Sequence, residues 1–425
     1  MSTNSSFSRR DCPRVFVTGM GFVTPFGIGA DPLLQAIKGG QCGVRKVTRF
    51  DVSDYSCQVA ACIPESLDVA QIIPPKRLKQ MDPSQALGVI AAMEALKHAE
   101  LDPATVDRER FGVFMGSGLG TPTTAINIAL TKERQNWRKI TPHMGVQYSF
   151  SGASAEIAID HDLRGPNVSI CCACASGNAA IGRAVRAIQR GDADRILAGG
   201  ADFVEEHVFV FFLRSRALAT SEDPRNPNAL RPFDRNRNGT IIADGAAVVM
   251  LESEKAARER GATIYGEILG MGETCDAYSM VRPRPDGITI ARSITLALED
   301  ARLSPQEVEM VCAHGTGTYP NDPAEVKALK LSLGDQAFKV PVVGMKSITG
   351  HGLGASSAIE LAASILCANA GIVPPTLHLE EPDPECDLDH VPLVAREMNY
   401  SVLLNLSFGF GGHNVVVAAR AGPPL

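Results

Sequence analysis

Short apolar runs alternate along the chain with longer segments whose apolar residues recur at helical spacing. In the first half, the apolar runs predict strands at residues 15–18, 113–115, 196–198 and 248–251. The helical spacing predicts helices at residues 86–98 and 179–189, and the charged segment 252–260 predicts a connection on the surface. Strands and helices that alternate in this way are typical of an α/β protein.

The second half repeats the same alternation. Its apolar runs predict strands at residues 264–270, 310–313, 342–344, 403–406 and 415–417, and its helical segments lie at 290–301, 322–331 and 355–370. A chain of 425 residues is long for one hydrophobic core. We therefore expect two similar units, residues 14–260 and 261–425, after a flexible tail at residues 1–13.

Charge and apolar content argue against two classes of function. The net charge is −6, whereas a protein that binds nucleic acid through its overall charge is usually basic. The apolar run 208–213 is far shorter than the roughly 18 residues needed to cross a bilayer. The N-terminal residues lack the apolar block of a secretory signal. We expect a cytoplasmic protein that contacts neither nucleic acid nor membrane.

The eleven cysteines are odd in number and scattered, which is typical of reduced thiols and not of a disulfide framework. Cys171, Cys172 and Cys174 lie close together. No second group of ligands stands at zinc spacing, so we expect no metal site.

Cys174 is the strongest candidate for a nucleophile. It precedes the predicted helix 179–189, in a segment of small residues, so it should lie at a helix N-terminus. There the helix dipole and free N–H groups would lower the pKa of the thiol and could also hold an oxyanion. Cys171 and Cys172 lie on the strand side, and we expect them to be buried structural cysteines.

Two histidines follow predicted strands among glycine and hydroxyl residues. His314 opens the segment His-Gly-Thr-Gly-Thr, and His351 comes five residues after Lys346. Neutral imidazoles in such loops could donate N–H bonds to a carbonyl that becomes an enolate.

The glycine-rich segment 409–412 predicts a hairpin turn. Beside a cysteine nucleophile, it could also supply a second oxyanion N–H, with Phe410 as a gate. No complete phosphate-loop or dinucleotide motif is present, which disfavours nucleotide binding.

With these cysteine, histidine and glycine-rich motifs, the chain resembles the β-ketoacyl-[acyl-carrier-protein] synthases, closest to the synthase II type and its type II polyketide relatives. The likeness runs roughly from Val15 to Ala419, and the order and spacing of its motifs are very specific. The matching strings are Val17-Thr-Gly-Met-Gly, Ala173-Cys-Ala-Ser-Gly, Ala198-Gly-Gly-Ala-Asp, Arg216-Ala-Leu, Ala313-His-Gly-Thr-Gly-Thr, Lys346-Ser-Ile-Thr-Gly-His-Gly-Leu-Gly-Ala and Ser407-Phe-Gly-Phe-Gly-Gly. The resemblance implies an α/β thiolase fold, in which two similar halves form a five-layered αβαβα core.

The resemblance also implies residue roles. Cys174 would be the nucleophile, completed by His314 and His351, and Lys346 would support this triad with Glu325 as its ion-pair partner. Phe410, between Gly409 and Gly411, would be the gate, and its N–H would share the oxyanion hole with that of Cys174. The remaining roles are pantetheine binding by Thr316 and Thr318, the acyl pocket at Leu119 and Phe212, and carrier-protein docking by Lys76, Arg77, Lys79, Arg138, Lys139 and Arg216.

The implied reaction is a decarboxylative Claisen condensation in fatty-acid or type II polyketide biosynthesis. An acyl group on Cys174 would combine with malonyl-[acyl-carrier-protein] to give a 3-oxoacyl chain two carbons longer. No cofactor would be bound tightly, because phosphopantetheine arrives on the acyl carrier protein. The partners would be this carrier, its acyl and malonyl thioesters, and a second subunit, in a homodimer or a heterodimer with a chain-length subunit.

Two other functions stay open. A thiolase-like enzyme acting on coenzyme A esters would have a second catalytic cysteine in a Cys-x-Gly motif near the C-terminus, whereas the last cysteine, Cys386, precedes Asp387. A non-elongating or chain-length partner subunit would lack the nucleophile, and Cys174 argues against it. Val281, Asn238 and Ala247 replace the threonine, aspartate and glycine that are usual in the family, which favours a specialised pathway.

Overall fold

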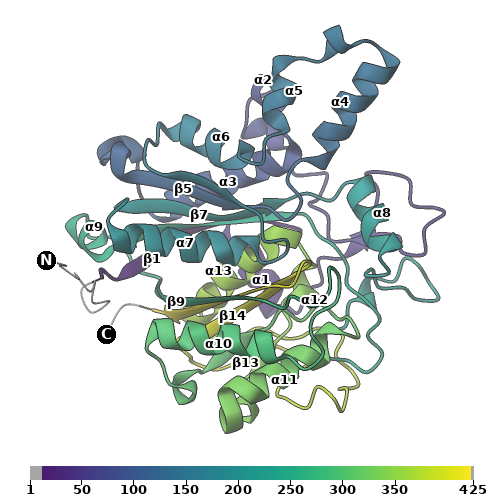
Figure 1. The fold of residues 1–425 in the computed structure, drawn as a ribbon, viewed down its shortest axis with the longest axis vertical. Helices are drawn as coiled ribbons and strands as arrows, with labels where there is room; N and C mark the ends of the chain where they lie inside the picture. Colours follow the sequence, from purple (N-terminus) through teal and green to yellow (C-terminus); the bar gives the residue numbers. More distant parts are fainter. Residues whose placement is uncertain (1–11, 423–425) are drawn as a thin grey trace, which may run out of the picture.

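The computed structural model describes residues 12–422, so residues 1–11 of the expected tail lie outside it. Figure 1 shows strands in two stacked arrays, with helices above, between and below them. The first array contains β6 (Asn167–Ile170), β5 (Phe111–Gly116), β7 (Arg195–Asp202), β8 (Gly245–Ser253) and β1 (Val15–Thr24), in that order. The second contains β11 (Val342–Val343), β10 (Met310–Cys312), β14 (Val402–Gly409), β15 (His413–Ala421) and β9 (Gly266–Cys275).

The two arrays have the same topology. In the first, β5 runs parallel to β6 and β7, while β8 is antiparallel to β7 and β1. In the second, β10 runs parallel to β11 and β14, while β15 is antiparallel to β14 and β9. A short antiparallel pairing of Phe16 with Glu267 and of Val17 with Gly266 joins the arrays.

Two buried helices form the middle layer, α7 (Ser176–Arg190) and α13 (Ser356–Asn369). Both are rich in alanine on their buried faces, which lets helix and sheet approach closely, and their apolar residues join one core with both arrays. Asn178 of α7 donates through Nδ2 to the carbonyl of Asn405 on β14, at 3.0 Å. This buried contact fixes the first half against the second.

The outer layers cover the remaining faces. Helix α3 (Pro83–His98) packs on the first array, and α10 (Ile288–Ala301) and α11 (Asn321–Leu333) cover the second. Helix α3 begins at a capping box, in which Asp82 and Gln85 satisfy backbone N–H groups. The order of layers is therefore helix, sheet, helix, sheet, helix, as the resemblance implies.

The other elements lie in the connections. The helices are α1 (Ala30–Lys38), α2 (Pro75–Leu78), α4 (Pro122–Arg134), α5 (Pro142–Gln147), α6 (Gly152–His161), α8 (Glu206–Arg214), α9 (Glu254–Glu259) and α12 (Lys346–Thr349). The short strands are β2 (Gly27–Ile28), β3 (Arg45–Lys46), β4 (Val59–Ala60), β12 (Ile372–Val373) and β13 (Arg396–Glu397). Helices α4 and α5 project from the first half (Figure 1). No helix of residues 12–422 is long and apolar enough to cross a membrane.

One prediction of local structure is wrong. The segment 252–260 is not simply a charged surface connection, because Glu252 is fully buried. Its carboxylate accepts hydrogen bonds from Arg195 and Arg260, so the charges of this segment neutralise one another below the surface. The rest of the segment forms the short helix α9.

Candidate active site

Cys174 lies in the tight turn between β6 and α7. Ala173 has a φ of 48°, in the left-handed region that non-glycine residues rarely adopt, and this bend turns the chain from strand to helix. The Cys172 N–H donates to the Ser176 hydroxyl at 2.9 Å, which closes the turn. From the other half, the Ser407 hydroxyl donates to the carbonyl of Cys174 at 3.0 Å. Both halves therefore hold the nucleophile in place.

The glycine-rich segment 409–412 forms the hairpin turn that the sequence predicts, because it joins β14 to β15. A side chain on Gly409 would meet the carbonyl oxygen of Cys172 at 2.7 Å, so only glycine lets this turn approach the cysteine so closely. The backbone N–H groups of Phe410 and Cys174 lie near the Cys174 Sγ, where they act to lower the pKa of the thiol. This pair of donors has the arrangement that an oxyanion hole requires.

The two histidines meet beside the cysteine. His314 follows β10 and His351 follows α12, and their ring centroids lie 5.6 Å apart in perpendicular planes. The Leu353 N–H donates to Nδ1 of His351 at 3.1 Å, so a neutral His351 carries its proton on Nε2. Nδ1 of His314 is buried and has no hydrogen-bond partner among residues 12–422.

Lys346 pairs with a different carboxylate from the one predicted. Its Nζ lies 2.7 Å from Oε1 of Glu360, and both side chains are fully buried. Glu325 instead accepts the N–H groups of His314 and Gly315, at 2.6 and 2.9 Å. The pairing with Glu325 is thus wrong: α13 brings Glu360 against α12, while the carboxylate of Glu325 is taken up by backbone donors. Glu325 holds the loop that carries His314.

Burial sets the protonation of these groups. Loss of solvent, followed by the nearby charge of Lys346, holds the pKa of His314 and of His351 well below the ordinary value, so both imidazoles are neutral at neutral pH. Burial also raises the pKa of Cys174 to about 12, although Lys346 and the two backbone N–H groups act in the opposite direction. This direction is opposite to the lowered thiol pKa that we predicted, because desolvation outweighs Lys346 and the nearby N–H groups.

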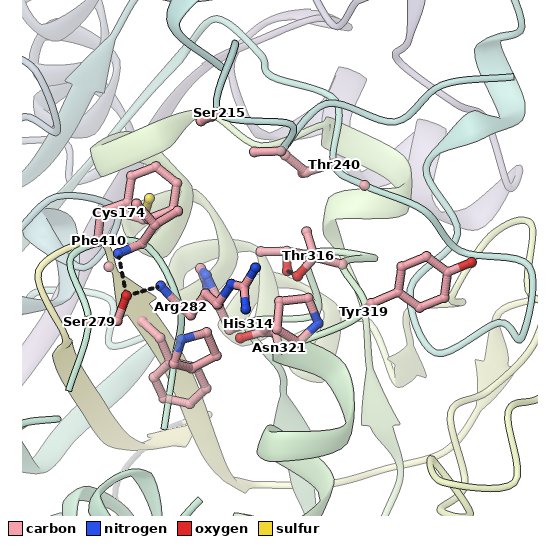
Figure 2. A pocket seen from close by; sticks show the side chains of 18 of the residues that line it. Cys174, Ser215, Thr240, Ser279, Arg282, His314, Thr316, Tyr319, Asn321 and Phe410 are labelled. Carbon is pink, nitrogen blue, oxygen red and sulfur yellow. Dashed lines mark hydrogen bonds between the residues drawn. The ribbon is translucent and has the colours of Figure 1, made fainter. Parts of the chain in front are cut away.

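A cavity of about 520 Å³ connects Cys174 with the surface (Figure 2). His314, His351 and Phe410 line it near the cysteine. Along one wall the side chains become progressively more exposed, from buried Thr316 through half-buried Thr318 to Tyr319, which is 59% exposed. The cavity therefore offers a substrate a path from the surface to the buried thiol.

Two family descriptions match the chain, "Beta-ketoacyl synthase, N-terminal domain" at residues 13–257 and "Beta-ketoacyl synthase, C-terminal domain" at residues 265–380. The chain belongs to the β-ketoacyl synthase family. The 3-oxoacyl-[acyl-carrier-protein] synthase 2 of Synechocystis is 38% identical over 409 residues, which are 96% of this chain and 98% of the relative. The same enzyme of Coxiella burnetii is 39% identical over 404 residues, 94% of this chain and 97% of the relative.

Solved structures agree with this assignment. A type II polyketide ketosynthase, bound to a hexaketide and in complex with its acyl carrier protein, superposes with a TM-score of 0.88 at 32% identity, over 97% of this chain and all of that one. The ishigamide ketosynthase/chain length factor gives the same values. A β-ketoacyl synthase from Burkholderia phymatum gives a TM-score of 0.89 at 32% identity, with 97% and 100% coverage. The five layers of this synthase are the thiolase fold.

The expected acyl-pocket residues lie beside the gate residue of the synthase. Phe212 lines the cavity, and its ring stacks on that of Phe410, with centroids 5.8 Å apart. Leu119 is half-buried and packs against the apolar cluster that contains Phe212, but the lining of the cavity does not include it. The role of Leu119 in an acyl pocket therefore stays a prediction.

The six expected docking cations fall in different places. Lys76, Lys79, Arg138 and Lys139 are exposed, on and beside α2 and between α4 and α5, whereas Arg216 lines the cavity. Arg77 is half-buried and pairs with Glu156, at 2.7 Å, and with Asp160. Arg77 thus ties α2 to α6, and its role in docking stays a prediction.

Some features of the site were not predicted from the sequence. Glu360 is the one charged residue of helix α13. A single carboxylate in an apolar helix was the sequence signal for a buried ion pair. Arg282 lines the cavity as well and had no signal beyond its neighbour Val281. The expectation that Cys171 is buried is wrong, because it lies exposed just after β6, the edge strand of the first array. Cys172 is buried, as expected.

Proposed function

We propose that this synthase elongates an acyl chain by decarboxylative Claisen condensation, with Cys174 as the acyl acceptor and malonyl-[acyl-carrier-protein] as the extender. One observation carries the proposal: a cysteine, two neutral imidazoles and two aimed N–H groups converge at the buried end of one cavity. Both the family and the names of its relatives, 3-oxoacyl-[acyl-carrier-protein] synthase 2, support this reaction.

In the first step, the Cys174 sulfur attacks the acyl thioester carried on phosphopantetheine. Because the pKa of this thiol is about 12, it is protonated at neutral pH and must lose its proton as the new bond forms. A neutral imidazole of the site can take that proton. The N–H groups of Cys174 and Phe410 hold the oxyanion, and the carrier thiol leaves with a proton.

In the second step, the malonyl thioester loses carbon dioxide. The electron pair of the broken carbon–carbon bond passes into an enolate, whose oxygen accepts hydrogen bonds from the two imidazoles, including Nε2–H of His351. The enolate carbon then attacks the Cys174 thioester, and the carbon–sulfur bond breaks. The chain leaves on the carrier two carbons longer, and the Cys174 thiolate takes up a proton from solvent, which restores the thiol.

No tightly bound cofactor is needed in this scheme, because the phosphopantetheine arm arrives with the acyl carrier protein. Thr316 and Thr318, whose hydroxyls lie 3.0 Å apart on the cavity wall, are the groups that would hold its amides. The carrier is supported as a partner by the solved ketosynthase that binds its own carrier protein.

We also propose that the synthase pairs with a second subunit, either another copy or a chain-length subunit. Strand β6 ends the first array, and the chain between β5 and β6 carries exposed apolar side chains. These are Ile126, Trp137, Val146, Tyr148, Phe150 and Ile159. Such a concentration is typical of an interaction surface, and one structural relative is a ketosynthase/chain length factor.

The alternative functions receive less support. A thiolase would need a second catalytic cysteine at the site, but Cys386 is buried elsewhere and does not line the cavity. A chain-length subunit without a nucleophile is disfavoured because Cys174 lies in a complete set of partners.

The test uses acyl- and malonyl-[acyl-carrier-protein] with the purified synthase. Wild type should form an acyl-enzyme at Cys174, seen by mass spectrometry, and then the 3-oxoacyl product. Cys174→Ala should form neither, whereas Cys174→Gln should still release carbon dioxide from malonyl carrier because both histidines remain. Cys171→Ala, at the exposed neighbouring thiol, is the matched control. Acylation of Cys174→Ala at Cys171 or Cys172 would show that the nucleophile was chosen wrongly.

A further inference from the structure

An arginine without an acidic partner lines the cavity that reaches Cys174. The Arg282 side chain is exposed, and among residues 12–422 it makes no ion pair or side-chain hydrogen bond. Arg284, two residues further on, differs: its Nε lies 2.9 Å from the carboxylate of Asp286, and it is not part of the cavity wall. Arg216 also lines the cavity and has no ion pair within the same described range.

The charges around the cavity favour an anion. Among the described residues that line the cavity, Asp276 is the only one with a carboxylate, and it is buried. Its oxygens are taken up by the Asn414 amide at 2.7 Å, the Arg284 N–H at 2.9 Å and the Thr289 hydroxyl. The imidazoles and the thiol are neutral, as shown above. Two arginines therefore face one carboxylate that is already satisfied, which leaves an excess positive charge along the path to the cysteine.

Arg282 lies where the outer end of a thioester arm bound in the cavity would lie. Its backbone N–H donates to the Ser279 hydroxyl at 3.2 Å, and the carbonyl of the neighbouring Met280 accepts the Gly411 N–H at 2.8 Å, so this loop is fixed against the Phe410 turn. A thioester arm must bring its sulfur to buried Cys174. The phosphate at its opposite end then comes to lie at the exposed part of the cavity, where Arg282 stands.

We propose that Arg282, with Arg216 as a weaker second cation, binds the phosphodiester of the phosphopantetheine arm and so selects phosphorylated thioesters. Guanidinium groups bind phosphate oxygens through parallel N–H bonds, which suits this role better than a lysine would. The inference rests on the proposed function, since it assumes that the arm delivers the acyl group to Cys174.

The test compares two small donors with the same acyl group, a 4′-phosphopantetheine thioester and a pantetheine thioester. Acylation of Cys174 is followed by mass spectrometry. Wild type should prefer the phosphorylated donor about 10-fold in kcat/KM, the effect of one hydrogen-bonded charge pair. Arg282→Gln should bring this ratio close to one, and Arg216→Gln should lower it less. The matched control Arg284→Gln should keep the wild-type ratio.

Several results would overturn the proposal. An unchanged ratio in Arg282→Gln would remove the phosphate contact, and a larger fall in Arg216→Gln would assign it to the other arginine. If Arg282→Gln slows only carrier-bound substrate, with the small-donor ratio intact, the arginine binds the carrier surface instead. A wild type that accepts an acyl group from neither small donor nor carrier would refute the proposed function itself.

Discussion

In the first half of the synthase, the loop between β6 and α7 carries Cys174, and the corresponding loop of the second half, between β11 and α13, carries Lys346 and His351. The loop after β5 holds Leu119, while that after its counterpart β10 holds His314. A repeated scaffold thus presents different chemistry at matching points. The first half supplies Cys174, the proposed acceptor of the acyl chain. The second supplies the two histidines proposed to stabilise the enolate, together with Lys346, which lowers the pKa of both.

The difference between the loops explains why both halves are needed. Helix α7 follows Cys174 directly, so backbone N–H groups face the sulfur. In the second half the extra turn α12 intervenes and places Lys346 and His351 on opposite sides of a bend. Asp202 of β7 joins the two regions, because its carboxylate accepts the Gly118 N–H at 2.8 Å and the Gly354 N–H at 2.7 Å.

The largest expected effect tests whether the two halves carry different steps of the reaction. His314→Ala and His351→Ala should still accept an acyl group on Cys174, because the first half and the Phe410 turn remain. Each should condense malonyl carrier about 100- to 1,000-fold more slowly, the usual effect of removing one donor to a developing oxyanion. Acyl-enzyme formation and release of carbon dioxide are measured separately. Wild-type elongation by both variants would contradict the enolate role.

A smaller effect concerns pH. Because Lys346 lowers the pKa of both histidines, Lys346→Met should raise it, and the imidazoles should become charged at a higher pH. The acid limb of the condensation rate should therefore move to higher pH. The profile is recorded down to the lowest pH at which both proteins stay folded, because the pKa of each wild-type imidazole lies well below its ordinary value. An acid limb that stays in place would contradict coupling through this charge.

The same substitution leaves Glu360 buried without its partner, so stability needs a control. Breaking a buried ion pair by removing one side costs about 3 kcal/mol or more, whereas neutralising both sides costs less. Lys346→Met with Glu360→Gln should therefore recover much of the lost unfolding free energy and keep the shifted pH limb. A double variant as unstable as the single one would show that the cost arises elsewhere.

The sequence predicts the fold better than the pairings within it. Apolar runs and helical periods are local, so they locate most strands of both arrays. Glu360 replaces Glu325 as the partner of Lys346 because the packing of α13 on α12, which no local pattern encodes, decides which carboxylate is near. The pKa of Cys174 likewise depends on burial by the whole fold, whereas the helix N-terminus is visible in the sequence.

Helices α4, α5 and α6 follow no clear helical period, and several of their apolar residues are exposed. A pattern argument assumes that apolar residues point to a core of the same chain. Side chains such as Trp137 and Ile159 break that assumption, which is the reason that sequence reasoning missed these elements.

A subtler test concerns the loop after β5, which carries no catalytic group. Leu119 packs against the apolar cluster that includes Phe212, so Leu119→Phe should reduce the space behind the Phe410 gate. We expect shorter products, because the bulkier ring takes space from the acyl chain. Product analysis by mass spectrometry checks this. An unchanged distribution with intact activity would remove Leu119 from the acyl pocket.

The smallest expected effect lies at the surface, where the first half carries Lys76 and Arg138. Rim charges act mainly on association rate, and screening beyond about 10 Å lets a local basic patch attract an acidic carrier despite a negative total charge. Lys76→Glu with Arg138→Glu should therefore weaken condensation with carrier-bound substrates by a few-fold, about 1 kcal/mol or less, and flatten its salt dependence. Arg77 is left unchanged because its pairing with Glu156 holds α2 to α6.

The decisive measurement is the ratio of the condensation rate with carrier-bound substrate to the rate with a small soluble thioester, since the small substrate uses only the cavity. Equal loss with both substrates would mean damage to the fold or the triad, and the carrier would then have to dock on another face.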